Sequence, residues 1–272
     1  WTRRRVAVEL DSAPLAVVDA LDGRAVVRRA EREDHHPRSF LDRAGFTQGA
    51  LYGVRVPGVA LEDRATGVGT ATRFELANLG DVTAKTGAQI QADSVAASVT
   101  EFLRPEDGVW DPRDPRVFYF VTTDRFQTST TDARSRLWRL RFDSVFTPEN
   151  GGTIEMLLDG TEGQQMLDNM TIDRRGNLLI QEDPGSQDHL ARIWQYTPAT
   201  DVLKLIAQHD PARFAPGGAA FLTRDEESSG IIDASDVLGR GWFLLDCQAH
   251  YATDAETVEG GQLLALYNPD SH

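Results

Sequence analysis

A short apolar run that ends in acidic or amide side chains occurs three times in this chain, and this repeat constrains the fold more than any other feature. The runs cover residues 117–124, 177–183 and 241–248. Each is followed by a second run that carries an aromatic residue, at residues 136–142, 191–196 and 262–267. Short runs of this kind, bounded by Gly, Pro, Asp and Asn, are typical of β-strands. The chain is therefore predicted to be all-β.

The repeat favours a β-propeller, in which four-stranded sheets are arranged radially around a central channel. We expect the apolar runs to be the innermost strands, because a strand buried on both faces has a continuous apolar sequence. Their polar ends would then lie at the channel mouth. An irregular β-sandwich could use the same strands but would not explain why each run ends in acid or amide groups. The runs recur at intervals of about 60 residues, longer than the shortest blades, which indicates inserted loops.

The first part of the chain lacks this pattern. We divide the sequence into a poorly matching N-terminal segment, residues 1–41, and a β-propeller domain, residues 42–272. The propeller is expected to be incomplete or N-terminally truncated. The stretch 24–43 has neither a helical nor a strand period.

Only a few local elements are predicted in and after this segment. Residues 5–10 and 15–18 are candidate strands, with Asp22-Gly23 as a hairpin turn. The pair His35-His36 is interpreted as part of an exposed polar loop, because adjacent residues on a strand point apart and do not converge on a metal. Residues 86–102 are predicted to form a helix from their Ala-rich spacing.

Composition excludes several classes of partner and site. The formal net charge of −14 argues against nucleic acid or an acidic membrane surface as a partner. No apolar run approaches the ~20 residues that a membrane span needs. The chain has one cysteine, Cys247, which excludes an intrachain disulfide framework and a multi-cysteine zinc site. Cys247 is expected to be a small core residue of a strand.

Carboxylate and amide groups near the predicted strands carry the functional prediction. The candidate metal ligands are Glu106, Asp168, Asn169, Glu182, Asp183, Glu226 and Glu227. Adjacent carboxylates repel each other, which is costly near a buried axis unless a cation compensates. Taken alone, the pair Glu226-Glu227 would more often be a solvated turn. Because Ca²⁺ prefers oxygen ligands, the sequence predicts a calcium site and not a zinc site.

Several motifs, taken in order, resemble the PhoX-like alkaline phosphatase family over about residues 42–270. They include FLRPEDGVWDP at 102–112, MLDNMTID at 166–173, LLIQEDPG at 178–185 and FLTRDEESSGIID at 221–233. The resemblance implies a β-propeller, a secreted or periplasmic location, and hydrolysis of phosphate monoesters by a site that holds iron and calcium ions. It implies that Arg104 contacts the phosphate and that Glu106 contacts the metals, as the catalytic pair. The other acidic motifs would supply further ligands.

The sequence departs from that family at one point. The family supplies an iron-ligating cysteine near a Cys-Glu-Glu motif, and nothing in residues 1–45 matches it. The cofactor prediction is therefore Ca²⁺, with Fe³⁺ as a further candidate. The expected substrate is a small phosphate ester. Two other hypotheses stay open: a non-catalytic secreted calcium-binding propeller, and a lactonase-type hydrolase.

Overall fold

The structure, a computed structural model, describes residues 15–21, 24–29, 49–62, 68, 71–124 and 134–271. The predicted loop residues His35 and His36 lie outside these ranges. The chain forms two compact units. The first comprises residues 1–103 and 140–155, and the second comprises residues 104–139 and 156–272. Each unit is described here by itself.

The first unit contains an antiparallel sheet with the strand order β1-β2-β3-β4-β8. The strands are β1 (Leu15–Leu21), β2 (Arg24–Arg29), β3 (Ala50–Arg55), β4 (Thr72–Gly80) and β8 (Gly152–Leu158), and a 3₁₀ turn, η1 (Pro148–Asn150), precedes β8. Strand β2 corrects the expectation for residues 24–43. It pairs with β1 on one side and β3 on the other, so pairing with two neighbours sets its conformation although its sequence has no strand period.

The predicted helix at 86–102 is shorter in the structure. Helix α2 (Gly87–Ala96) begins with a capping box, in which the side chains of Thr86 and Gln89 each accept a hydrogen bond from the other residue's backbone N–H. It ends early because the chain turns at Ser98, where φ is 56°. Thr100 then pairs with β3: its N–H donates to Val54 O, and its hydroxyl accepts from Val56 N.

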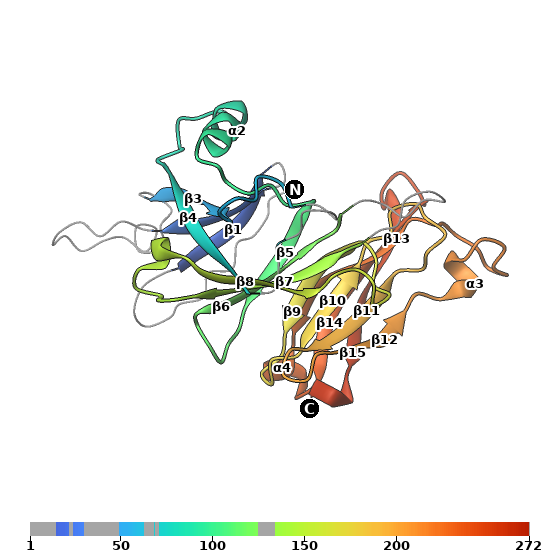
Figure 1. Cartoon of the computed structure of the whole chain (residues 1–272). Helices are drawn as coiled ribbons and strands as arrows, with labels where there is room; N and C mark the ends of the chain where they lie inside the picture. Colours follow the sequence, from blue (N-terminus) through green and yellow to red (C-terminus); the bar gives the residue numbers. More distant parts are fainter. Residues whose placement is uncertain are drawn as a thin grey trace. The chain divides into compact units, whose positions relative to one another are not determined.

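The second unit contains antiparallel strands with the orders β7-β6-β5, which are part of a larger sheet, β12-β11-β10-β9 and β13-β14-β15 (Figure 1). The strands of the first two sheets are β5 (Pro105–Trp110), β6 (Val117–Thr122), β7 (Arg136–Phe142), β9 (Leu167–Ile172), β10 (Leu178–Glu182), β11 (Arg192–Thr197) and β12 (Val202–Gln208). The third sheet has β13 (Glu226–Asp233), β14 (Trp242–Ala252) and β15 (Glu259–Tyr267). Short helical turns complete the unit: α3 (Pro211–Phe214), α4 (Ser235–Leu238) and η2 (Pro269–Ser271).

Antiparallel sheets thus dominate the described residues, and the all-β prediction is confirmed. Among these residues, no helix is both long enough and apolar enough to cross a membrane.

The apolar runs of the repeat are middle strands, which corrects the expectation that they are innermost. They correspond to β6, β10 and β14, each hydrogen-bonded on both sides. The preceding strands, β5, β9 and β13, form the edges of their sheets, and β9 contacts both of the others. The middle strands have continuous apolar sequences because other strands flank them on both edges and apolar side chains pack on both of their faces.

Apolar layers between the three sheets hold the second unit together. Val121 and Leu137 share one buried cluster with Leu178 and Ile180 of β10. On the other face of β10, Leu179 packs in a second cluster with residues of β13 and β14: Ile231, Phe243 and Leu245. Neighbouring residues of β10 therefore serve two different layers, as the alternation of side chains along a strand requires.

Each of the three edge strands contains a one-residue β-bulge. In β5, the two residues Glu106 and Asp107 lie opposite one residue of β6. In β9, Asp168 and Asn169 lie opposite Gln181. In β13 the extra residue falls between Ser229 and Ile232. A bulge leaves backbone groups unpaired within its own sheet and redirects side chains, so acidic and amide residues gather where edge strands meet.

Candidate functional site

Four carboxylates of the second unit are here called the carboxylate cluster, because the charges of three of them act on the ionisation of the fourth, Asp168: Glu106, Asp183 and Glu227. Burial raises the pKa of Asp168 to about 7, and the negative charges of Glu106, Asp183 and Glu227 add to the rise. Burial and the charge of Asp183 also raise the pKa of Glu227. The cluster therefore concentrates negative charge that a cation would offset.

Two cationic or basic side chains border the cluster. Arg104 Nη2 lies 3.7 Å from Glu106 Oε1, and 46% of the Arg104 side chain is exposed. Burial raises the pKa of Asp183, and the charges of Arg104 and His250 oppose that rise. His250 Nδ1 lies 2.9 Å from Glu259 Oε2. Arg104 adopts a φ of 56°, an uncommon value for a residue other than glycine. Such backbone positions occur more often at functional sites.

In the bulges of β5 and β9, the first residue belongs to the carboxylate cluster, whereas the second forms hydrogen bonds to a neighbouring edge strand. Asp107 Oδ2 accepts a hydrogen bond from Met170 N at 3.0 Å, which links β5 to β9. Asn169 Oδ1 accepts from Gly230 N at 2.7 Å and from Ser229 Oγ at 2.6 Å, which links β9 to β13. The predicted ligand Asn169 thus uses its carbonyl oxygen within the protein. Asp107 was not among the predicted site residues.

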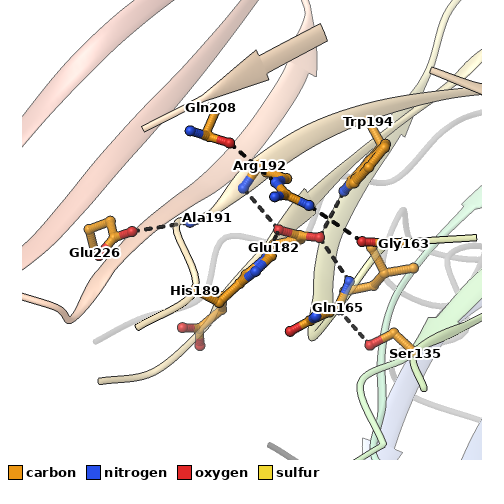
Figure 2. A network of polar contacts seen from close by, with 12 residues as sticks. Ser135, Gly163, Gln165, Glu182, His189, Ala191, Arg192, Trp194, Gln208 and Glu226 are labelled. Atoms are coloured by element: carbon orange, nitrogen blue, oxygen red, sulfur yellow. Dashed lines mark hydrogen bonds and ion pairs between the residues drawn. The ribbon is translucent and has the colours of Figure 1, made fainter. Parts of the chain in front are cut away.

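Glu182 and Glu226, also predicted as ligands, lie in a second polar network (Figure 2). Both side chains are buried, with 0% and 1% exposure. Glu182 accepts hydrogen bonds from Gln165 N and Arg192 N, and Glu226 Oε1 accepts from Ala191 N at 3.1 Å. Glu226 lies in strand β13 and is buried, so the interpretation of Glu226-Glu227 as a solvated turn is wrong.

The pairs Glu182-Asp183 and Glu226-Glu227 follow the alternation of side chains in extended chain. Asp183 and Glu227 take part in the carboxylate cluster, whereas the residue before each binds backbone N–H groups of a neighbouring segment. The alternation of side chains along an extended chain is the sequence signal that places the two members of each pair on opposite sides. The network partners His189 and Trp194 had no such signal, because their hydrogen bonds to Glu182 depend on the folded loop.

Glu226 differs from the cluster residues in its second oxygen. Oε2 is buried and has no hydrogen-bond partner among the described residues, and burial raises the pKa of Glu226 to about 7. Burial disfavours the ionised form of such a side chain. Glu226 is thus a buried side chain with one oxygen bound to the backbone and one oxygen without a partner among the described residues.

The donor chemistry of the carboxylate cluster fits a hard cation. Its side chains offer only carboxylate oxygens, which Ca²⁺ prefers. Within the described ranges, no three His, Cys, Asp or Glu side chains form a ready-made metal site, so the fit lies in donor type and charge. Cys247 is buried in a core cluster with Phe214 and Ala249, and burial raises its thiol pKa to about 11, which disfavours the thiolate that a metal binds.

The pKa of Asp168 predicts how metal-free protein responds to pH. The folded-state pKa of about 7 lies above the ordinary value of 3.8, so the folded state binds more protons than the unfolded state between these values. The free energy of unfolding is therefore expected to fall as pH rises from about 4 to about 7. Urea midpoints in EGTA between pH 5 and 8 measure this, and Asp168→Asn should flatten the slope. An unchanged slope in that variant would contradict the assignment.

Comparison with known proteins gives a likeness of fold. No protein-family model and no curated protein matches the chain. The structure of Pseudomonas fluorescens PhoX in complex with vanadate, a transition state analogue, matches with a TM-score of 0.58 and 17% sequence identity. The match covers 94% of this chain and 53% of the PhoX chain, so this chain spans about half the length of that protein. This confirms the fold relationship that the motifs implied, while function has to be argued from the site.

Proposed function

We propose that the second unit binds Ca²⁺ at the carboxylate cluster and, in the loaded state, hydrolyses phosphate monoesters. The observation that carries the proposal is that the charges of Glu106, Asp183 and Glu227, which come from separate parts of the sequence, all act on the buried carboxyl group of Asp168. An all-oxygen ligand set of this charge suits Ca²⁺. The similarity of the fold to PhoX, whose structure holds vanadate as a transition state analogue, supports phosphoryl transfer as the reaction class.

Arg104 is proposed to bind the phosphate group. Its guanidinium can donate two parallel hydrogen bonds to phosphate oxygens, and the exposure of its side chain leaves it accessible to a substrate. Glu106, beside it, is proposed as a cation ligand. Bound cations would offset the negative charge that builds up on the phosphate during the reaction. Without them, the carboxylate cluster of a chain with net charge −14 repels a phosphate ester.

The finer architecture belongs to the same proposal. We propose that the sheets of the second unit are blades of a β-propeller, supported by their face-to-face packing and by the contacts of β9 with β5 and β13. A secreted or periplasmic location is proposed with it, on the resemblance of the acidic motifs to the PhoX-like family.

The deciding experiment is an assay of the chain reconstituted with Ca²⁺. Hydrolysis of p-nitrophenyl phosphate is measured alongside hydrolysis of a lactone, and the metal content of the purified protein is determined by mass spectrometry. Phosphate-ester turnover that requires Ca²⁺ supports the proposal, and iron found together with calcium would extend it to a mixed site. Calcium binding without turnover favours the non-catalytic module, and turnover of the lactone alone favours the lactonase-type hydrolase. Absence of both binding and turnover overturns the proposal.

A further inference from the structure

Glu182 has every acceptor position of its carboxylate occupied by the protein (Figure 2). Oε1 accepts hydrogen bonds from Gln165 N and Trp194 Nε1, both at 2.8 Å. Oε2 accepts from Arg192 N at 3.0 Å and lies 2.7 Å from His189 Nε2. A cation could bind Glu182 only by displacing buried donors, which would then lose their partners at a cost of about 1–3 kcal/mol each.

The donors that Glu182 holds lie next to two members of the carboxylate cluster. Gln165 stands just before β9, which carries Asp168. His189 lies in the loop 183–191, and Arg192 follows that loop as the first residue of β11. The loop begins with Asp183, whose N–H donates to Met166 O at 2.9 Å. One carboxylate therefore ties together the approach to Asp168 and the far end of the loop that carries Asp183.

Two further carboxylates hold the loop 183–191. Asp225 Oδ1 accepts from Ser186 N at 2.6 Å, and Glu226 Oε1 accepts from Ala191 N. The loop is thus anchored to β13 as well as to β10. These anchors fix both ends of the segment that begins with Asp183, which lies beside the approach to Asp168 through the bond from Asp183 N to Met166 O.

We propose that Glu182 is a positioning residue for the calcium site and not a ligand of it. It holds the start of β9 and the loop 183–191 in the arrangement that brings Asp168 and Asp183 together. The proposal rests on the proposed calcium site. Residues that orient metal ligands through hydrogen bonds typically change metal affinity by about 10–100-fold when they are replaced.

Trp194→Phe separates positioning from direct ligation, because it removes the indole donor to Oε1 and leaves the Glu182 carboxylate in place. Trp138→Phe is the matched control. Trp138 is also buried in the second unit, and its Nε1 donates to Thr122 Oγ1 at 3.1 Å, away from the Glu182 network. Calcium affinity of each full-length variant is measured by titration calorimetry, and hydrogen exchange is followed in the loop 183–191. If Trp194→Phe does not fold, His189→Ala removes a donor to the other oxygen.

We expect Trp194→Phe to weaken calcium binding about 10-fold or more and to speed exchange in the loop 183–191, while Trp138→Phe stays within about twofold of wild type. Wild-type affinity in Trp194→Phe, or an equal loss in both variants, would overturn the positioning role. So would abolition of binding by Glu182→Gln together with unchanged binding in Trp194→Phe, since that pattern marks a ligand. If the wild-type protein itself binds no calcium, the proposed function fails, and the exchange measurement alone decides the role of Glu182.

Discussion

Arg104→Ala is expected to lower kcat/KM for p-nitrophenyl phosphate by about 100-fold or more in calcium-loaded protein, because it removes the donors proposed for the phosphate oxygens. Loss of one well-placed donor to developing negative charge typically costs about 10²–10³ in rate. Glu106→Gln, which removes a proposed ligand, is expected to reduce activity at low calcium most strongly. The free energy of unfolding should change little in Arg104→Ala, because the side chain is half exposed.

Arg116→Ala provides a matched control for the first substitution. The Arg116 side chain has the same exposed fraction, 46%, and pairs at 3.2 Å with Asp114, two residues away, just as Arg104 stands two residues from Glu106. Steady-state kinetics of both variants test whether Arg104 has a specific role in phosphate-ester hydrolysis. Full activity of Arg104→Ala, or an equal loss in Arg116→Ala, would rule out a specific role for Arg104.

Removal of calcium is expected to abolish phosphate-ester hydrolysis and to lower the urea midpoint of the second unit. The physical reason is that the cluster holds buried negative charge without a cation: burial raises the pKa of Asp168 to about 7, and the charges of Glu106, Asp183 and Glu227 add to the rise. A ligand present at 100 times its Kd stabilises the folded state by about 2.7 kcal/mol. Denaturation and turnover are compared in calcium, in magnesium and in EGTA.

Two substitutions test whether the stabilisation by calcium depends on the carboxylate cluster. Glu227→Gln should reduce the stabilisation by calcium, because Glu227 belongs to the cluster. Glu256→Gln should leave it unchanged, because Glu256 is exposed in the loop between β14 and β15. Equal unfolding curves in calcium and EGTA would show that no cation binds the folded chain with useful affinity.

The sequence predicted the strands of the second unit well, because the apolar runs at 117–124, 177–183 and 241–248 coincide with β6, β10 and β14. Their place within the sheets was predicted wrongly. Periodicity reports burial on both faces but does not say which neighbour lies on each edge. The edge strand β9 shows the difficulty, since it contains the polar residues Asp168 and Asn169 and has no continuous apolar run.

The acidic pairs were recognised as functional from the sequence, but their members were not separated. Alternation would have assigned Glu182 and Asp183 to opposite sides of the chain. It would not have shown that Glu182 binds Gln165 N and Trp194 Nε1, because these contacts join residues 17 and 12 positions away along the chain. Such partners become visible only when the loop between β10 and β11 is folded.

The bulges of β5 and β9 place two side chains opposite a single residue of the neighbouring strand. Glu106 contributes to the carboxylate cluster while Asp107 bonds to Met170 N, and Asp168 and Asn169 divide the work in the same way. Deletion of one residue at either bulge would restore a regular ladder of hydrogen bonds. One side chain would then remain where the bulge now has both a cluster carboxylate and a residue that bonds to the neighbouring strand. These short stretches should therefore tolerate exchange of one amino acid for another far better than any change in length.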